Sequence, residues 1–78
     1  MAATGEEHER LARRLREVLI EARKAADIKQ VDLAKALGRS QSFVSNYERG
    51  ERRVDVPELI LIARELGVDA SGLLARLL

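Results

Sequence analysis

The chain has 78 residues, of which 46% are hydrophobic, and it contains no cysteine. This length allows one small domain, and the lack of cysteine excludes disulfide bonds and thiolate metal sites. The net charge is only +1, so composition by itself does not indicate nucleic-acid binding.

The charges are unevenly distributed along the chain. Residues 1–28 carry no net charge, residues 29–53 carry +3 and residues 54–78 carry −2. The middle third is therefore the basic part of the sequence. No apolar run is long enough to span a membrane, and no signal-peptide core follows the start. We therefore expect a cytoplasmic protein that does not interact with membranes.

Five short helices and no strands are predicted, which is an all-α fold. Residues 1–6 are expected to form a flexible N-terminus, and residues 7–78 a single domain. Apolar residues at helical spacing predict a first helix from about Glu7 to Ala26. The second helix, from about Gln30 to Leu37, should end at Gly38, because glycine readily adopts the left-handed conformation of a helix end.

The remaining helices are predicted from their end signals. Ser40 is a good N-cap for a third helix from about Gln41 to Arg49, which Gly50 should end. Asp55 and Glu58 form a capping-box pattern for a fourth helix from about Val56 to Leu66. Asp69 should cap a fifth helix from about Ala70 to Leu77.

Residues 30–49 have the spacing of a helix-turn-helix, in which two short helices are joined by a tight glycine turn. Small Ala34 permits close approach of the two helices. One face of the third helix is polar or basic, because at about 100° per residue five such side chains fall within one arc. These residues are Gln41, Ser42, Ser45, Asn46 and Arg49. Glutamine and asparagine can pair with adenine, so we interpret this face as base-reading rather than merely solvated.

The sequence closely resembles the lambda-repressor/Cro-type helix-turn-helix family, also called the XRE family. The matching residues are Gln30, Leu33-Ala34, Leu37-Gly38, Ser40-Gln41-Ser42, Val44-Ser45, Tyr47-Glu48, Gly50, Leu59, Ile62-Ala63 and Leu66-Gly67-Val68. The resemblance covers about residues 15–74. It implies a five-helix lambda-repressor-like domain that binds double-stranded DNA.

The resemblance also implies roles for individual residues. Gln41, Ser42 and Asn46 occupy positions that reach base edges, and Gln30 would contact a phosphate and brace Gln41. Arg49, Arg52 and Arg53 follow the recognition helix, where the family binds the DNA backbone.

Three further residues are assigned to the DNA backbone with alternatives left open. Phe43 lies at the border of the buried face, so it either presses on a thymine methyl or sugar or packs on its own neighbours. Lys29 stands where the family usually has a capping Thr, Ser or Asn. Arg39 occupies a turn position that is often apolar, and it is either solvated or bound to a phosphate.

Arg23 and Glu48 match a paired position in some phage repressors. Glu48 projects toward the core side of its helix, where a carboxylate needs a cation. We therefore expect a structural ion pair between the two.

The fifth helix carries four leucines, Leu73, Leu74, Leu77 and Leu78. A short helix on one domain can bury only one stripe, so one pair should complete the core and the other should be exposed or buried by a second subunit. We assign the four leucines to a dimer interface. A two-fold dimer would read a palindromic operator.

The predicted function is a sequence-specific DNA-binding transcription regulator, bacterial or phage-encoded, acting as a repressor and a homodimer. The alternative is an antitoxin-type module that binds a partner protein as well as DNA. No nucleophile–base set, metal cluster or phosphate loop is evident, so we expect no enzyme activity, cofactor, metal or small-molecule ligand. His8, the only histidine, is expected to be a surface residue.

Overall fold

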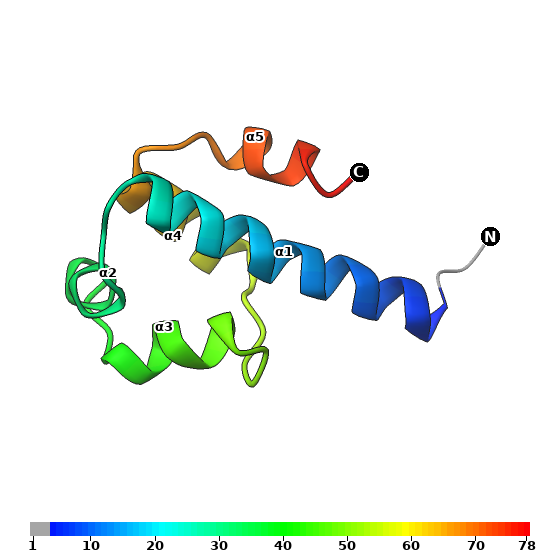
Figure 1. Cartoon of the computed structure of the whole chain (residues 1–78), viewed down its shortest axis with the longest axis horizontal. Helices are drawn as coiled ribbons and strands as arrows, with labels where there is room; N and C mark the ends of the chain where they lie inside the picture. The colour runs from blue at the N-terminus through cyan, green and yellow to red at the C-terminus, as the bar shows by residue number, and fades with distance from the viewer. Residues whose placement is uncertain (1–3) are drawn as a thin grey trace.

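The computed structural model describes residues 4–78, which form five helices and no strand (Figure 1). The helices are α1 (Gly5–Ala25), α2 (Gln30–Ala36), α3 (Gln41–Glu48), α4 (Val56–Leu66) and α5 (Ala70–Ala75). The all-α fold with a helix-turn-helix that the sequence predicts is therefore confirmed. No helix in the described part of the chain is both long and apolar enough to cross a membrane.

Both ends of α4 and the starts of α2, α3 and α5 lie where they are predicted, and the other helix boundaries differ by one or two residues. α1 begins at Gly5 rather than Glu7, because the hydroxyl of Thr4 accepts a hydrogen bond from the backbone N–H of Glu7 at 3.0 Å. α5 ends at Ala75, two residues before the predicted end. The segment expected to be flexible, residues 1–6, thus overlaps the first helix. Residues 1–3 lie outside the described residues.

The predicted capping box at the start of α4 is present. Oδ1 of Asp55 accepts a hydrogen bond from the backbone N–H of Glu58 at 2.8 Å, and the backbone N–H of Asp55 donates to Oε1 of Glu58 at 3.0 Å. Ser40 and Asp69 occupy the predicted N-cap positions, but neither side chain accepts a capping hydrogen bond from a backbone N–H of its helix. Ser40 instead pairs with the hydroxyl of Ser42 at 2.8 Å.

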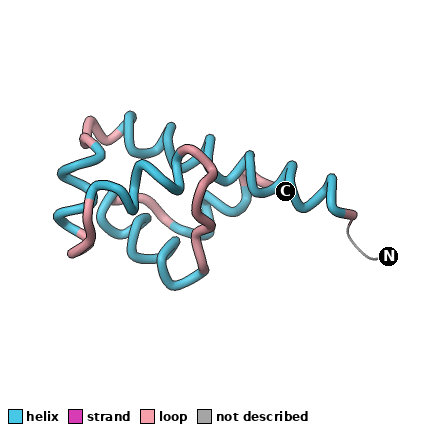
Figure 2. Tube along the Cα trace, turned by 90° about the horizontal axis from the view of Figure 1, so that it is seen from below, coloured by secondary structure: helices cyan, strands magenta, loops and turns pink. Residues whose placement is uncertain are grey.

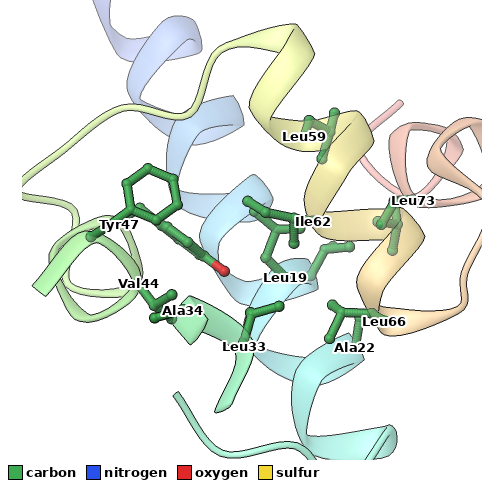
Figure 3. Packing of buried hydrophobic residues seen from close by; sticks show 13 residues of the cluster. Leu19, Ala22, Leu33, Ala34, Val44, Tyr47, Leu59, Ile62, Leu66 and Leu73 are labelled. Atoms are coloured by element: carbon green, nitrogen blue, oxygen red, sulfur yellow. The ribbon is translucent and has the colours of Figure 1, made fainter. Parts of the chain in front are cut away.

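The hydrophobic core lies between the C-terminal half of α1 and the other four helices (Figures 1 and 3). Its buried members are Val18, Leu19, Ala22, Leu33, Ala34, Phe43, Val44, Tyr47, Leu59, Ile62, Ala63, Leu66 and Leu73. The first turns of α1 extend beyond the other helices (Figure 2). Val31 on α2 is apolar but half exposed.

Tyr47 is the largest fully buried side chain. Its ring packs edge to face against Phe43, with ring centroids 5.5 Å apart. Its hydroxyl is buried and has no hydrogen-bond partner among the described residues, and burial raises the pKa of this phenol. The core side of α3 is therefore aromatic and closely packed, which fixes the direction in which its opposite face points.

Two glycines shape the turns around α3. Gly38 has φ +67° in the turn between α2 and α3, and Gly50 has φ +80° just after α3. These left-handed conformations favour glycine because it has no Cβ. A Cβ on Gly50 would also lie 2.8 Å from Cζ of Arg16 in α1. Gly38 therefore allows the chain to turn after α2, and Gly50 allows it to turn after α3.

Candidate nucleic-acid interface

The outer face of α3 carries the side chains that the sequence predicts to read bases. Gln41 and Ser42 are exposed, whereas Ser45 and Asn46 are half-buried. Oδ1 of Asn46 accepts a hydrogen bond from Nη2 of Arg49 at 2.8 Å, and its amide nitrogen has no partner among residues 4–78. The face thus presents amide and hydroxyl groups away from the core. Their contact with bases stays a prediction.

Several cations predicted to bind the DNA backbone are exposed around α3. Lys29 occupies the N-cap position of α2 and makes no side-chain capping hydrogen bond, as its residue type suggests. Nη2 of Arg49 also lies 3.2 Å from Oε2 of Glu51. Nη1 of Arg53 lies 2.9 Å from Nε2 of His8, which is exposed as expected. These side chains are available at the surface for anionic groups.

Arg39 and Arg52 are also predicted to bind the backbone, but each already pairs with Glu58 of α4. Nη2 of Arg39 lies 2.7 Å from Oε2 of Glu58. Nη1 of Arg52 donates to Oε1 of the same carboxylate at 2.8 Å, and Nη2 of Arg52 donates to Oε2 at 2.6 Å. The Arg52 hydrogen bond is the main reason why the pKa of Glu58 is lowered to about 2. Sequence reasoning identified Glu58 only as a helix cap.

Of the two alternatives left open for Phe43, the structure favours packing on its own neighbours over contact with the DNA backbone, because its side chain belongs to the core. Phe43 is only 8% exposed and packs against Tyr47. The guanidinium carbon atoms of Arg39 and Arg52 lie 4.3 Å and 4.6 Å from the centroid of its ring. At about 100° per residue the border of a helix face is too coarsely defined to decide this position from sequence.

Arg23 and Glu48, the predicted ion pair, are in contact. Nε of Arg23 lies 2.7 Å from Oε2 of Glu48, and both side chains are nearly buried. The hydrogen bond from Arg23 to Glu48 is the main reason why the pKa of Arg23 is raised. Arg23 also donates to the carbonyl oxygen of Ile28 at 2.8 Å. This network holds α1 against the end of α3.

The expected bracing of Gln41 by Gln30 is not observed. Nε2 of Gln30 donates instead to Oε1 of Glu48 at 2.8 Å. A buried carboxylate that already accepts from an arginine still has lone pairs to satisfy, and the amide of Gln30 supplies a second donor. Gln30 therefore stabilises the ion pair of α1 and α3 in this structure.

The four leucines of the C-terminal segment divide into two pairs, as helix geometry requires. Leu73 is 4% exposed, and Leu77 packs partly buried against the same core. Leu74 is 42% exposed and Leu78 is fully exposed. Assigning Leu73 and Leu77 to a dimer interface is therefore wrong, because they complete the core of their own subunit. Leu74 and Leu78 remain available to a partner.

Sequence reasoning missed further exposed apolar residues on α4. Ile60 and Leu61 are each nearly half exposed, and Val56 at the start of the helix is more exposed still. Helical spacing along α4 could have revealed them. Leu59, Ile62 and Leu66 already account for its buried face, so the other apolar residues must lie outside that face. No group of three potential metal ligands occurs among residues 4–78.

Comparison with known proteins gives the following matches. The helix-turn-helix family model matches residues 19–73. An XRE-family-like protein from Pseudomonas syringae pv. tomato is 47% identical, with a TM-score of 0.86 over 90% of this chain and 85% of that chain. The clp gene regulator ClgR from Corynebacterium glutamicum is 25% identical, with a TM-score of 0.79 over 86% of this chain and 71% of that chain. No curated protein matches the sequence significantly.

Proposed function

The chain belongs to the XRE family of helix-turn-helix DNA-binding transcription regulators, and on this basis we propose that it reads a specific operator in the major groove with α3. We further propose that it acts as a homodimer and as a repressor, in the cytoplasm of a bacterium or encoded by a phage. The bacterial origin of both structural neighbours supports that setting.

The observation that carries the proposal is the division of α3 into two faces. Val44 and Tyr47 are fully buried, while the opposite face presents Gln41, Ser42 and Asn46. Amide side chains can pair bidentately with adenine, and a hydroxyl can serve several bases. In this proposal these residues together with Ser45 contact bases.

The surrounding cations supply the sequence-independent part of the proposed binding. Lys29 is exposed just before α2, and Arg49 and Arg53 are exposed just after α3. Cations at such positions neutralise phosphates and fix the register of the recognition helix on the duplex. The amide of Gln30 donates one N–H to Glu48, so its second N–H remains available for a phosphate.

The dimer is proposed from the exposed apolar residues and from the limited reach of one helix. Leu74 and Leu78 are exposed on the C-terminal segment, and Ile60 and Leu61 are exposed on α4. A contiguous exposed apolar surface usually marks an interface. A two-fold dimer would place the two copies of α3 about 34 Å apart, in successive major grooves. Its operator would be palindromic.

Selection of bound sequences from a random pool of double-stranded DNA tests this function. The proposal predicts enrichment of one short half-site, repeated in inverted orientation with centres about 10 base pairs apart. A single enriched half-site would retain base reading by α3 but contradict the dimer. A pool that shows no enrichment after repeated rounds, although the protein retains DNA, would contradict sequence-specific reading.

A further inference from the structure

Glu58 at the start of α4 joins two cations from opposite ends of α3. Arg39 belongs to the turn before α3, and Arg52 to the loop after it. Both guanidinium groups lie within 2.7 Å of the same oxygen, Oε2 of Glu58. One carboxylate therefore fixes the positions of two long side chains that are far apart in sequence.

The ring of Phe43 is the second element that orders these arginines. Both guanidinium groups lie over this ring, which is itself held against Tyr47 in the core. Arginine side chains lose conformational entropy when a ligand orders them, so prior ordering makes later contacts more favourable. Glu58 and Phe43 together provide that order before any DNA arrives.

The ordered arginines still have surface and hydrogen-bond donors available for a phosphate. The side chains of Arg39 and Arg52 are 44% and 37% exposed, whereas that of Glu58 is only 11% exposed. Arg39 uses only Nη2 toward Glu58, and its Nε and Nη1 donate to no other residue in the range 4–78. A guanidinium has five N–H donors, so several remain free.

We propose that Glu58 is a positioning residue, which holds the guanidinium groups of Arg39 and Arg52 together over Phe43 in the first turn of α3, so that both contact DNA phosphates. This inference rests on the proposed reading of DNA by α3 and adds a role for a residue on α4. The two arginines keep a net positive charge after pairing with one carboxylate, so the cluster still attracts an anion.

Replacement of Glu58 by glutamine tests the role while keeping the helix cap, because glutamine also serves at this capping-box position. The matched control is Glu65→Gln, which makes the same charge change at an exposed position of the same helix. Affinity for the selected operator is measured over a range of salt concentrations. Relative to Glu65→Gln, we expect Glu58→Gln to bind about tenfold more weakly and to lose about one unit of the salt slope.

A second variant and a coupling measurement separate positioning from simple charge. Glu58→Asp keeps the charge but shortens the side chain, and it should also weaken operator binding. Arg39→Ala should weaken binding in the parent protein but have little further effect in Glu58→Gln. Circular dichroism and thermal unfolding confirm that each variant is folded before its affinity is compared.

Charge neutralisation without positioning predicts a different set of results. If Glu58 only neutralises the arginines, Glu58→Gln will bind DNA as tightly as Glu65→Gln or more tightly, and Glu58→Asp will match the parent; either result overturns the positioning role. Gln41→Ala is measured in parallel. If it weakens operator binding while Glu58→Gln does not, only this inference fails. If the parent protein selects no sequence, the proposed function itself fails.

Discussion

Nε of Arg23 in α1 lies 2.7 Å from Oε2 of Glu48, the last residue of α3, so an ion pair ties the central helix to the end of the helix that carries the polar face. Replacement of Glu48 by leucine should lower the free energy of unfolding by about 3 kcal/mol, because the charge of Arg23 is left nearly buried and unpaired. The double variant Arg23→Met/Glu48→Leu should lose less than the single variant. Denaturant unfolding measures the free energy of unfolding of the single and the double variant.

The exposed pair of Arg14 and Glu17 in α1 is the control for that cycle, because its members are much more exposed. Arg14→Ala should change the free energy of unfolding by less than about 1 kcal/mol. If the double variant loses as much free energy of unfolding as Arg23→Met and Glu48→Leu lose in sum, Arg23 and Glu48 are not energetically coupled, and this interpretation is wrong.

Acid should destabilise the protein partly through Glu58. Its hydrogen bonds with Arg52 lower the pKa of Glu58 from 4.5 to about 2, so the folded state favours the ionised carboxylate. This contribution is complete above the unfolded pKa of 4.5 and is lost as the pH falls from there toward 2. Because the arginines are more than one-third exposed, we expect only about 1–2 kcal/mol.

Urea unfolding of the parent and of Glu58→Gln at about pH 6 and about pH 3 measures this contribution. The parent should be the more stable protein at the higher pH, and the difference should shrink at the lower pH. Glu65→Gln is the control, and its difference from the parent should stay small at both values. A difference for Glu58→Gln that is the same at both pH values would contradict the lowered pKa.

Arg53 in the loop after α3 should contact a phosphate. Its side chain is exposed and contacts the side chain of His8. Arg53→Ala should weaken binding to all DNA sequences alike and reduce the salt slope by about one unit. Arg76→Ala changes the residue just after α5, which lies on the side of α1 away from α3 in Figure 1, and should leave the slope unchanged. An unchanged slope for Arg53→Ala would mean that this cation lies away from the DNA.

Leu74 on α5 should lie in the dimer interface. A glutamate at this position would place a charge in an apolar contact, so Leu74→Glu should be monomeric and should bind the operator more weakly. Sedimentation at micromolar concentration distinguishes dimer from monomer. Ala75→Glu introduces the same charge about 100° further round the helix and should remain dimeric. A parent protein that is monomeric and binds one half-site without cooperativity would defeat the proposed dimer.

Much of the fold could be predicted from the sequence because its signals are local. Gly38 and Gly50 adopt the left-handed conformations expected of them, and Asp55 and Glu58 form the expected capping box. Each signal acts within a few residues, so no knowledge of the tertiary structure is needed. Because these signals are local, the observed helix ends lie close to the predicted ones. The largest change at a helix start is in α1, which begins at Gly5 because Thr4 caps it.

The errors concern side chains whose surroundings are set by distant segments. Arg39 and Arg52 meet Glu58 only because the tertiary fold brings the start of α4 close to the turn before α3, and sequence spacing does not contain that geometry. Gln30 was assigned to Gln41 by resemblance, but the buried carboxylate of Glu48 is the stronger acceptor. The sequence likewise does not show which pair of leucines in the C-terminal segment is buried, because that depends on how α5 lies against α1.

Base reading by α3 is the central claim, and measuring operator affinity for Gln41→Ala and Asn46→Ala tests it most directly. Each variant should bind the selected operator more weakly by about 1–3 kcal/mol and should lose preference at one base pair, while non-specific binding barely changes. Ser71→Ala on α5 is the control and should bind like the parent. If Gln41→Ala and Asn46→Ala both bind the operator with the affinity and sequence preference of the parent protein, α3 does not read the bases.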